Sequence, residues 1–121
     1  FVSLGWPHYN IEELHTVARL LEGRTCQTPV WVMTNPLTFK AAEMMGLKGT
    51  IQDAGASLLS GSCCGLLMGE MPPAAVMATD AAKQDYYITG TVYPKKLQVW
   101  YGTTEDCIEA ALTGRWQGGW E

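Results

Sequence analysis

Four cysteines and one histidine are the residues of this chain whose types and positions most favour chemistry. The cysteines are Cys26, Cys63, Cys64 and Cys107, and His8 lies in a turn-like segment ahead of the first predicted helix. Thiolates bind zinc, iron and iron–sulfur clusters, and an imidazole that faces a cleft can act as an acid or a base. The alternative for each is structural, because a cysteine is often a small buried hydrophobe and a histidine often binds backbone carbonyls.

Cys63 and Cys64 lie in a loop punctuated by glycines, residues 61–69. Neighbouring side chains of an extended loop point in opposite directions, so these two thiols are not expected to bind the same ion. The chain has no Cys-x-x-Cys or His-x-x-x-His pair that would form a local zinc site. Any metal site must therefore combine residues that are distant in sequence, and Cys63 and Cys107 are the predicted ligands, with packing as the alternative.

Alternating strand and helix signals predict the elements that position these side chains. Asn10 and Glu13 form a capping box ahead of an apolar helical stripe, and Thr103 and Asp106 form another. Short apolar runs rich in β-branched and aromatic residues predict strands. The expected strands are residues 29–34, 57–60, 74–79 and 97–101, and the expected helices are residues 11–21, 37–45, 51–54, 81–87 and 108–112.

This order of elements predicts a single α/β domain over residues 1–121. The expected architecture has three layers, with a mainly parallel sheet of about four strands and helical crossovers. Ligands of such sheets bind outside the carboxyl ends of the strands, beside the N-termini of the following helices. Thr79 and Thr103 are predicted to lie at this edge and to bind substrate, and Cys63 and Cys107 are predicted at the same edge.

His8 and Lys83 complete the predicted cleft. His8 is the candidate catalytic residue, since the flanking glycine and proline predict a shaped turn that presents the imidazole. Lys83 lies early in the predicted helix 81–87 and is a candidate ligand for a substrate carboxylate or phosphate. A solvated lysine on a helix surface is the common alternative.

Composition excludes several classes of protein. The chain has 121 residues, 47% of them hydrophobic and 17% charged, as expected of one globular domain. Twelve acidic residues against eight basic ones give a net charge of -4, and no cluster of Lys or Arg suits nucleic acid. No apolar run approaches the roughly 18 residues of a membrane span. The few cysteines favour a reducing, cytoplasmic location.

Several short segments, in order along the chain, carry a family resemblance. They are Gly5–Tyr9, Ile11–Leu14, Ala18–Gly23, Trp31–Thr34, Asp53–Ala56, Thr79–Lys83, Tyr101–Ala111 and Gly114–Trp116. Together they resemble the carboxyl-terminal part of the large subunit, or large domain, of the aconitase X family. The resemblance covers essentially the whole chain and implies an aconitase-like α/β domain that is a piece of a longer large subunit.

The resemblance also implies an activity. Family members are hydro-lyases (dehydratases) that remove water from a small hydroxy acid such as cis-3-hydroxy-L-proline or mevalonate 5-phosphate. They use a [2Fe-2S] cluster or a mononuclear iron, and the best-matching ligands here are Cys63 and Cys107. Departures from the family pattern at Trp6, Asn35–Pro36 and Ala81 concern the substrate rather than the fold.

The implied partners are the rest of the large subunit and a small swivelling domain or subunit. The family's active site lies between these parts, so the isolated chain is expected to fold but to be inactive. The alternative function is a noncatalytic α/β binding or assembly module whose cysteines pack in the core. Iron bound by the assembled protein would separate the two possibilities.

Overall fold

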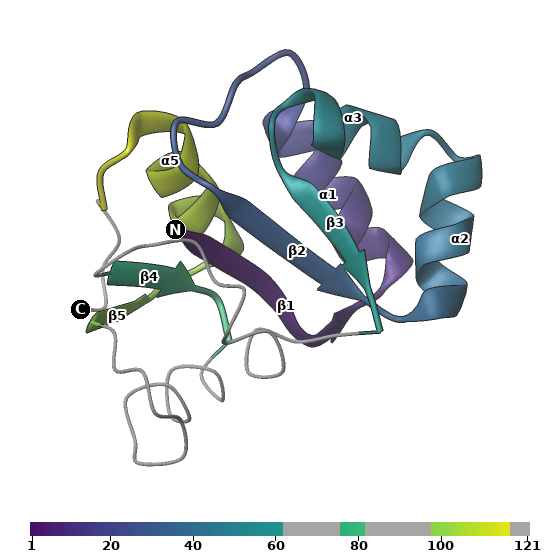
Figure 1. Ribbon diagram of the computed structural model, residues 1–121, viewed down its shortest axis with the longest axis horizontal. Coiled ribbons are helices and arrows are strands. Elements are labelled where there is room, and N and C mark those ends of the chain that lie inside the picture. Colours follow the sequence, from purple (N-terminus) through teal and green to yellow (C-terminus); the bar gives the residue numbers. More distant parts are fainter. Residues whose placement is uncertain (62–75, 82–97, 117–121) are drawn as a thin grey trace.

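The fold was determined as a computed structural model, which describes residues 1–61, 76–81 and 98–116. Several predictions lie outside these residues: the loop that carries Cys63 and Cys64, the helix expected over residues 81–87, and Lys83. The chain folds around a parallel sheet (Figure 1).

The sheet contains five described strands in the spatial order β3-β2-β1-β4-β5, and every neighbouring pair is parallel. The strands are β1 (Val2–Tyr9), β2 (Val30–Thr34), β3 (Ser57–Ser60), β4 (Val76–Thr79) and β5 (Gln98–Tyr101). The prediction of an α/β fold with a mainly parallel sheet is thus confirmed, with one strand more than expected. All the carboxyl ends of these strands meet at one edge of the sheet.

The extra strand is β1, which is the central strand of the sheet. Sequence patterns assigned the second half of β1 to a turn, because glycine and proline interrupt the strand signal there. The structure explains this: Leu4 pairs with Val32 and Tyr9 pairs with Thr34, so five residue steps on β1 match two on β2. The three extra residues of β1 therefore bulge out of the ladder.

Gly5 makes this bulge possible. Its φ of +86° lies in the left-handed region, where a side chain strains the backbone. A Cβ atom at this position would also lie 2.4 Å from the carbonyl oxygen of Met33 on β2. Only glycine fits the point where the bulge leaves the ladder.

α1 (Ile11–Leu21) has the predicted bounds, whereas α5 (Thr104–Thr113) begins four residues before the expected helix 108–112, directly after its predicted cap. Both helices start with a complete capping box, and Gly114 ends α5 in the left-handed conformation. α2 (Pro36–Met44) starts at proline after the Asn35 cap, also as expected.

The helix expected over residues 51–54 is longer than predicted and begins earlier. α3 spans Leu47–Asp53, so Thr50 lies inside it instead of capping it. The Thr50 hydroxyl donates to the carbonyl of Gly46, 3.2 Å away, which is the bond of a threonine within a helix.

The core lies between the sheet and the helices. Val2, Leu4, Val30 and Val32 form one cluster with the buried residues of α1, α3 and α5, and α1 and α5 lie behind the sheet in Figure 1. Met33 and Met77 belong to no part of this cluster and are nevertheless completely buried. The described helices cover one face of the sheet, and the third layer expected on the other face stays a prediction.

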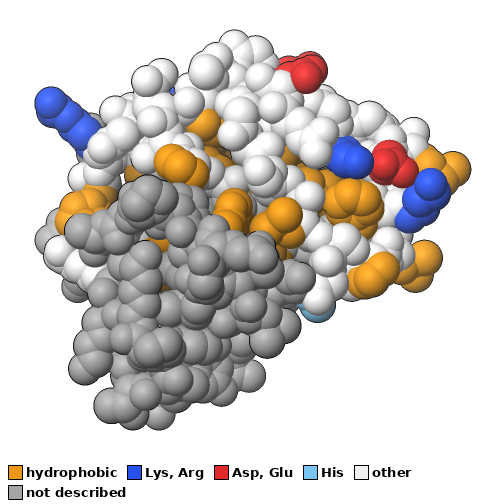
Figure 2. Space-filling view, in the orientation of Figure 1, with side chains coloured by type: hydrophobic (Ala, Val, Ile, Leu, Met, Phe, Trp, Pro, Cys, Tyr) orange, Lys and Arg blue, Asp and Glu red, His pale blue; other side chains and the backbone are white. Residues whose placement is uncertain are grey.

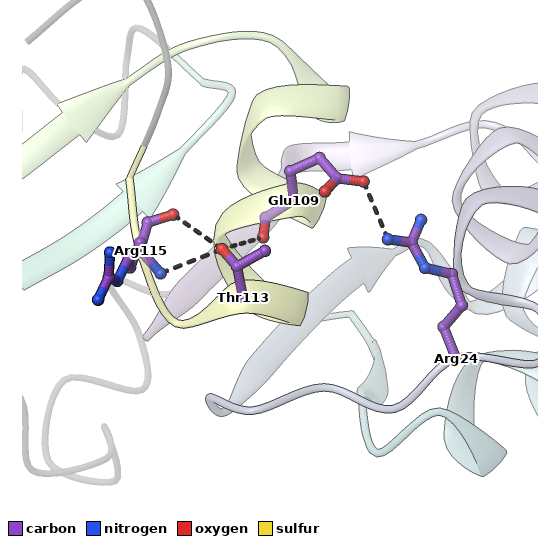
Figure 3. Close-up of polar contacts among 4 residues, drawn as sticks. All are labelled: Arg24, Glu109, Thr113 and Arg115. Carbon is purple, nitrogen blue, oxygen red and sulfur yellow. Dashed lines mark hydrogen bonds and ion pairs between the residues drawn. The ribbon is translucent and has the colours of Figure 1, made fainter.

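An exposed ion pair joins the loop after α1 to α5 at the surface. The Arg24 guanidinium lies 3.1 Å from a Glu109 carboxylate oxygen, and both side chains are about half exposed (Figure 3). Next to it, the Thr113 hydroxyl donates to the Glu109 carbonyl and accepts from the backbone N–H of Arg115. Such exposed pairs add little stability, about 0–1 kcal/mol.

Candidate functional site

Three side chains from different elements meet at the carboxyl edge of the sheet. Tyr9 is the last residue of β1, Asp80 follows β4 directly, and Thr104 is the first residue of α5. The Tyr9 hydroxyl donates to Asp80 Oδ2, and the Thr104 hydroxyl donates to the same oxygen at 2.8 Å. We call these three residues the Asp80 network.

Local sequence explains why each side chain reaches this point. The bulge in β1 carries Tyr9 past the end of the regular ladder, where its ring lies against Gly5. Thr103 caps α5, so Thr104 lies in the first turn of the helix beside the end of β4. The β1–β4 and β4–β5 pairings bring these ends together.

Burial defines the electrostatics of the network. Tyr9 is 5% exposed. Desolvation, and then the neighbouring Asp80 carboxylate, raise the pKa of the Tyr9 phenol far above its ordinary value. Tyr9 is therefore a permanent hydrogen-bond donor at physiological pH and holds the carboxylate in place.

The two oxygens of Asp80 are unequally used. Oδ2 accepts two hydroxyl hydrogen bonds, whereas Oδ1 has one long contact, 3.4 Å from the backbone N of Gly5. A carboxylate oxygen accepts about two hydrogen bonds. Because Asp80 is only half-buried, Oδ1 can accept a hydrogen bond or a proton from a bound molecule.

Three of the predicted site residues each lie one position before a member of the Asp80 network. His8 is exposed in the β1 bulge, Thr79 ends β4 and is completely buried, and Thr103 caps α5. The Thr79 hydroxyl accepts the backbone N–H of Ala81, and the Thr103 hydroxyl accepts that of Asp106. Both threonines therefore bind backbone groups, and their roles toward a substrate stay predictions.

Cys107 lies in the core rather than in an open cleft. Its side chain is completely buried within the cluster that includes Ile108 and Ala111. Desolvation, and then the carboxylates of Asp80 and Asp106, raise the pKa of the Cys107 thiol well above its ordinary value. The protonated thiol is favoured, which weighs against a metal ligand, although no contact of the described chain tests the prediction directly.

The other predicted ligands do not gather among the described residues. Cys63 and Lys83 lie outside them, and residues 1–61, 76–81 and 98–116 contain no cluster of three His, Cys, Asp or Glu side chains that could hold a metal ion. These residues by themselves do not form an iron site.

The other half of the carboxyl edge, at β2 and β3, uses its polar groups differently. The Thr34 hydroxyl donates to the backbone carbonyl of Tyr9 at 2.6 Å. The Asn35 side chain accepts the backbone N–H of Thr38 and so caps α2. Both of these side chains complete backbone structure, and no described carboxylate joins them.

A cavity lies at the opposite, amino edge of the sheet. It has a volume of about 330 Å³ and lies against the first residues of β1 and β4 and the end of α5. Trp100 and Trp116 form one wall, with ring centroids 5.8 Å apart. Its mainly aromatic and aliphatic lining suits a small hydroxy acid less well than the Asp80 network does.

The fold and this site define an α/β domain whose polar side chains gather at the carboxyl edge of a parallel sheet. Residues 1–113 match the family described as the aconitase X third domain. The chain therefore belongs to the aconitase X family. No helix of the described residues is long and apolar enough to cross a membrane.

Two curated relatives are similar over part of their length. The chain is 29% identical over 89 residues to the phosphomevalonate dehydratase large subunit of Methanothermobacter thermautotrophicus, covering 74% of this chain and 22% of the relative. It is 27% identical over 117 residues to the cis-3-hydroxy-L-proline dehydratase of Hypocrea jecorina, covering 93% and 19%. The chain thus spans about a fifth of the length of these relatives.

The holo-form crystal structure of Thermococcus kodakaraensis aconitase X has the same fold, with a TM-score of 0.73 at 20% identity. The match covers 91% of this chain and 28% of that one. The fold expected from the family resemblance is therefore confirmed.

Proposed function

We propose that this chain is the third domain of a dehydratase that removes water from a small hydroxy acid such as cis-3-hydroxy-L-proline or mevalonate 5-phosphate. The names of two relatives support this class of reaction. The observation that carries the proposal is the Asp80 network, because it presents a carboxylate oxygen at the edge where parallel α/β sheets bind ligands.

Asp80 is the proposed acceptor for the substrate. Tyr9 and Thr104 hold Oδ2, so the carboxylate keeps its orientation while Oδ1 accepts a hydrogen bond from a substrate hydroxyl. This orientation needs no rearrangement when substrate arrives, which favours the ordered geometry that dehydration requires.

His8 is the proposed catalytic residue, and it acts as acid or base from the exposed bulge next to Tyr9. Lys83 is the proposed partner of the substrate's carboxylate or phosphate. Thr79 and Thr103 are proposed to form the wall of the substrate site, since their hydroxyls already bind backbone groups.

Iron is the proposed cofactor, as a [2Fe-2S] cluster or a single ion. Bound iron would act as a Lewis acid on the hydroxyl that leaves. Cys63 and Cys107 are the proposed ligands from this chain, with further ligands from the rest of the large subunit. Cys107 is the less favourable of the two proposed ligands, because iron binding would have to remove a proton from a buried thiol.

The proposed partners are the rest of the large subunit and a small swivelling domain or subunit. This chain covers about a fifth of the relatives, one of which is named as a large subunit. The domain therefore supplies one side of the cleft and does not catalyse alone, and the proposed location is the cytoplasm.

The test is an activity assay on the complete assembly, with the isolated 121-residue chain as control. The assembly is expected to dehydrate cis-3-hydroxy-L-proline or mevalonate 5-phosphate, and the isolated chain neither. Turnover by the isolated chain contradicts the proposed need for partners. An assembly that folds and dehydrates neither compound supports the noncatalytic module instead.

Iron analysis of anaerobically purified assemblies tests the ligands separately. Cys63→Ser and Cys107→Ser are both expected to lower the iron content per assembly. If Cys107→Ser keeps its iron and only lowers the melting temperature, Cys107 is a core residue and the ligand assignment is wrong.

A further inference from the structure

α2 has hydrophobic side chains on its outer face as well as its inner one. Leu37 is 83% exposed and Met44 is 79% exposed, and Met45, directly after the helix, is 53% exposed. They are the large hydrophobic side chains found exposed in residues 1–61, 76–81 and 98–116. Isolated exposed hydrophobes are normal, but three on one short helix and its cap form a patch.

The spacing of these residues places them on one side of α2. Leu37, Ala41 and Met44 are four and three positions apart, so they form one stripe along a helix. On the inner side, Ala42 is buried and Phe39 packs against the core. A surface helix normally has one apolar face, so the second face is built to be covered. We call Leu37, Ala41, Met44 and Met45 the α2 patch.

Polar residues border the α2 patch, and a hollow adjoins it. Glu43 pairs with Lys40 at 3.2 Å and with Lys48 at 3.0 Å. Figure 2 shows hydrophobic side chains beside charged ones at the end of the molecule where Figure 1 places α2. A hollow of about 250 Å³ between α1 and α3 reaches Met45. An apolar centre with a charged rim is the usual anatomy of a protein interface.

We infer that the α2 patch docks on the part of the large subunit that lies outside residues 1–121. This inference rests on the proposal that the chain is a piece of a longer large subunit. The family match is to a third domain, and the chain covers only 22% and 19% of its curated relatives. α2 also begins directly after β2, at the carboxyl edge that holds the Asp80 network.

A covalently linked domain suits this patch better than a second copy of the chain. Stable dimers bury about 800 Å² on each partner, more than one face of a nine-residue helix offers. A domain on the same polypeptide is held at high effective concentration, so a smaller contact is enough.

Photo-crosslinking in the complete large subunit, without its small partner, identifies the occupant. A photoreactive amino acid in place of Leu37 is expected to form cross-links to residues of the same polypeptide outside 1–121, equally well after dilution. Cross-links to residues 62–75, to a second large subunit or only to an added small subunit would each overturn the inference, as would no cross-link at all.

Methionine oxidation measures the same docking without the photoreactive group. If the docked state is favoured about tenfold, Met44 is oxidised about tenfold more slowly than in the unfolded subunit. Leu37→Glu is expected to abolish this protection of Met44. Gln52→Glu adds the same charge at an exposed position of α3 and is expected to leave the protection unchanged. The buried Met33 must stay protected in all three proteins, which shows that they are folded.

Rapid oxidation of Met44 in the unsubstituted large subunit would overturn the inference. Neither readout uses dehydratase activity. A large subunit that docks but does not catalyse would therefore contradict the proposed function alone, and one that catalyses with an exposed α2 patch would contradict this inference alone.

Discussion

The two halves of the carboxyl edge use similar residues for different purposes. At β2 and β3, Thr34 and Asn35 bind backbone groups and complete the ladder and the cap of α2. At β1 and β4, Tyr9 and Asp80 bind each other through their side chains, and one carboxylate oxygen keeps capacity for a ligand. A polar residue at the correct edge is therefore not yet a site residue, because the group that its side chain binds decides what it can do.

Gly5 links the two halves, so replacing it has the largest expected effect on stability. Gly5→Ala introduces a Cβ 2.4 Å from the Met33 carbonyl at a φ of +86°. We expect a loss of about 3 kcal/mol or more, or no folded protein. Gly23→Ala is the control, since φ is +73° but nothing lies within 4 Å of the new atom. Urea unfolding of the 121-residue chain measures both, and equal losses would show that the close approach to Met33 is unimportant.

Replacing Thr34 tests the half of the carboxyl edge at β2 and β3. Thr34→Val keeps the shape but removes the buried hydroxyl that donates to the Tyr9 carbonyl. The expected loss is about 1–2 kcal/mol of unfolding free energy. Thr16→Val removes a hydrogen bond from a hydroxyl to the carbonyl of Glu12 at the surface of α1. It should change the free energy of unfolding by less than about 0.5 kcal/mol. If Thr34→Val changes stability as little as Thr16→Val does, this half is not held as described.

Alkaline pH tests the burial of the Asp80 network. The pKa of Tyr9 is raised on folding, so above its ordinary value of 10.0 the unfolded chain loses a proton that the folded chain keeps. The contribution of Tyr9 to stability is fully present below about pH 10 and is lost as pH rises, with a slope of up to about 1.4 kcal/mol per pH unit. Tyr9→Phe should remove this part of the slope, measured by urea unfolding from about pH 8 to about pH 11, whereas the part that comes from the raised pKa of the buried Cys107 thiol is expected in both proteins. An unchanged slope would mean that the Tyr9 hydroxyl is accessible to water.

The sequence predicted the parts of this fold that depend on neighbouring residues. Each of the capping boxes at Asn10 and Thr103 spans only four residues of chain, so α1 and the N-cap of α5 could be placed closely, although α5 begins earlier than the expected residues 108–112. β1 could not, because its bulge is stabilised by contacts with β2 rather than by its own pattern. The edge containing Asp80 and Thr104 was predicted correctly from the order of strands and helices.

The predicted residues at this edge differ from the observed network by one position. Tyr9 and Asp80 are 71 residues apart, and no local signal shows that their side chains meet. For Cys107 a signal did exist: Ala111 lies four positions later on the same face of an apolar helix, which indicates core packing. Residues of special chemistry are therefore better assigned after the buried face of their helix is known.

Turnover by Asp80→Asn and Thr34→Val in the complete assembly, measured with the hydroxy acid that the unsubstituted assembly dehydrates, tests which half of the carboxyl edge holds the chemistry. The amide that replaces the Asp80 carboxylate keeps the size of the side chain. It removes the negative charge of the group that is proposed to accept a hydrogen bond from the substrate. Asp80→Asn is expected to lower kcat by at least about 100-fold, and Thr34→Val by less than about threefold despite its lower stability. Equal kcat values for the two variants would contradict the claim that the chemistry lies in the half of the edge built by β1 and β4.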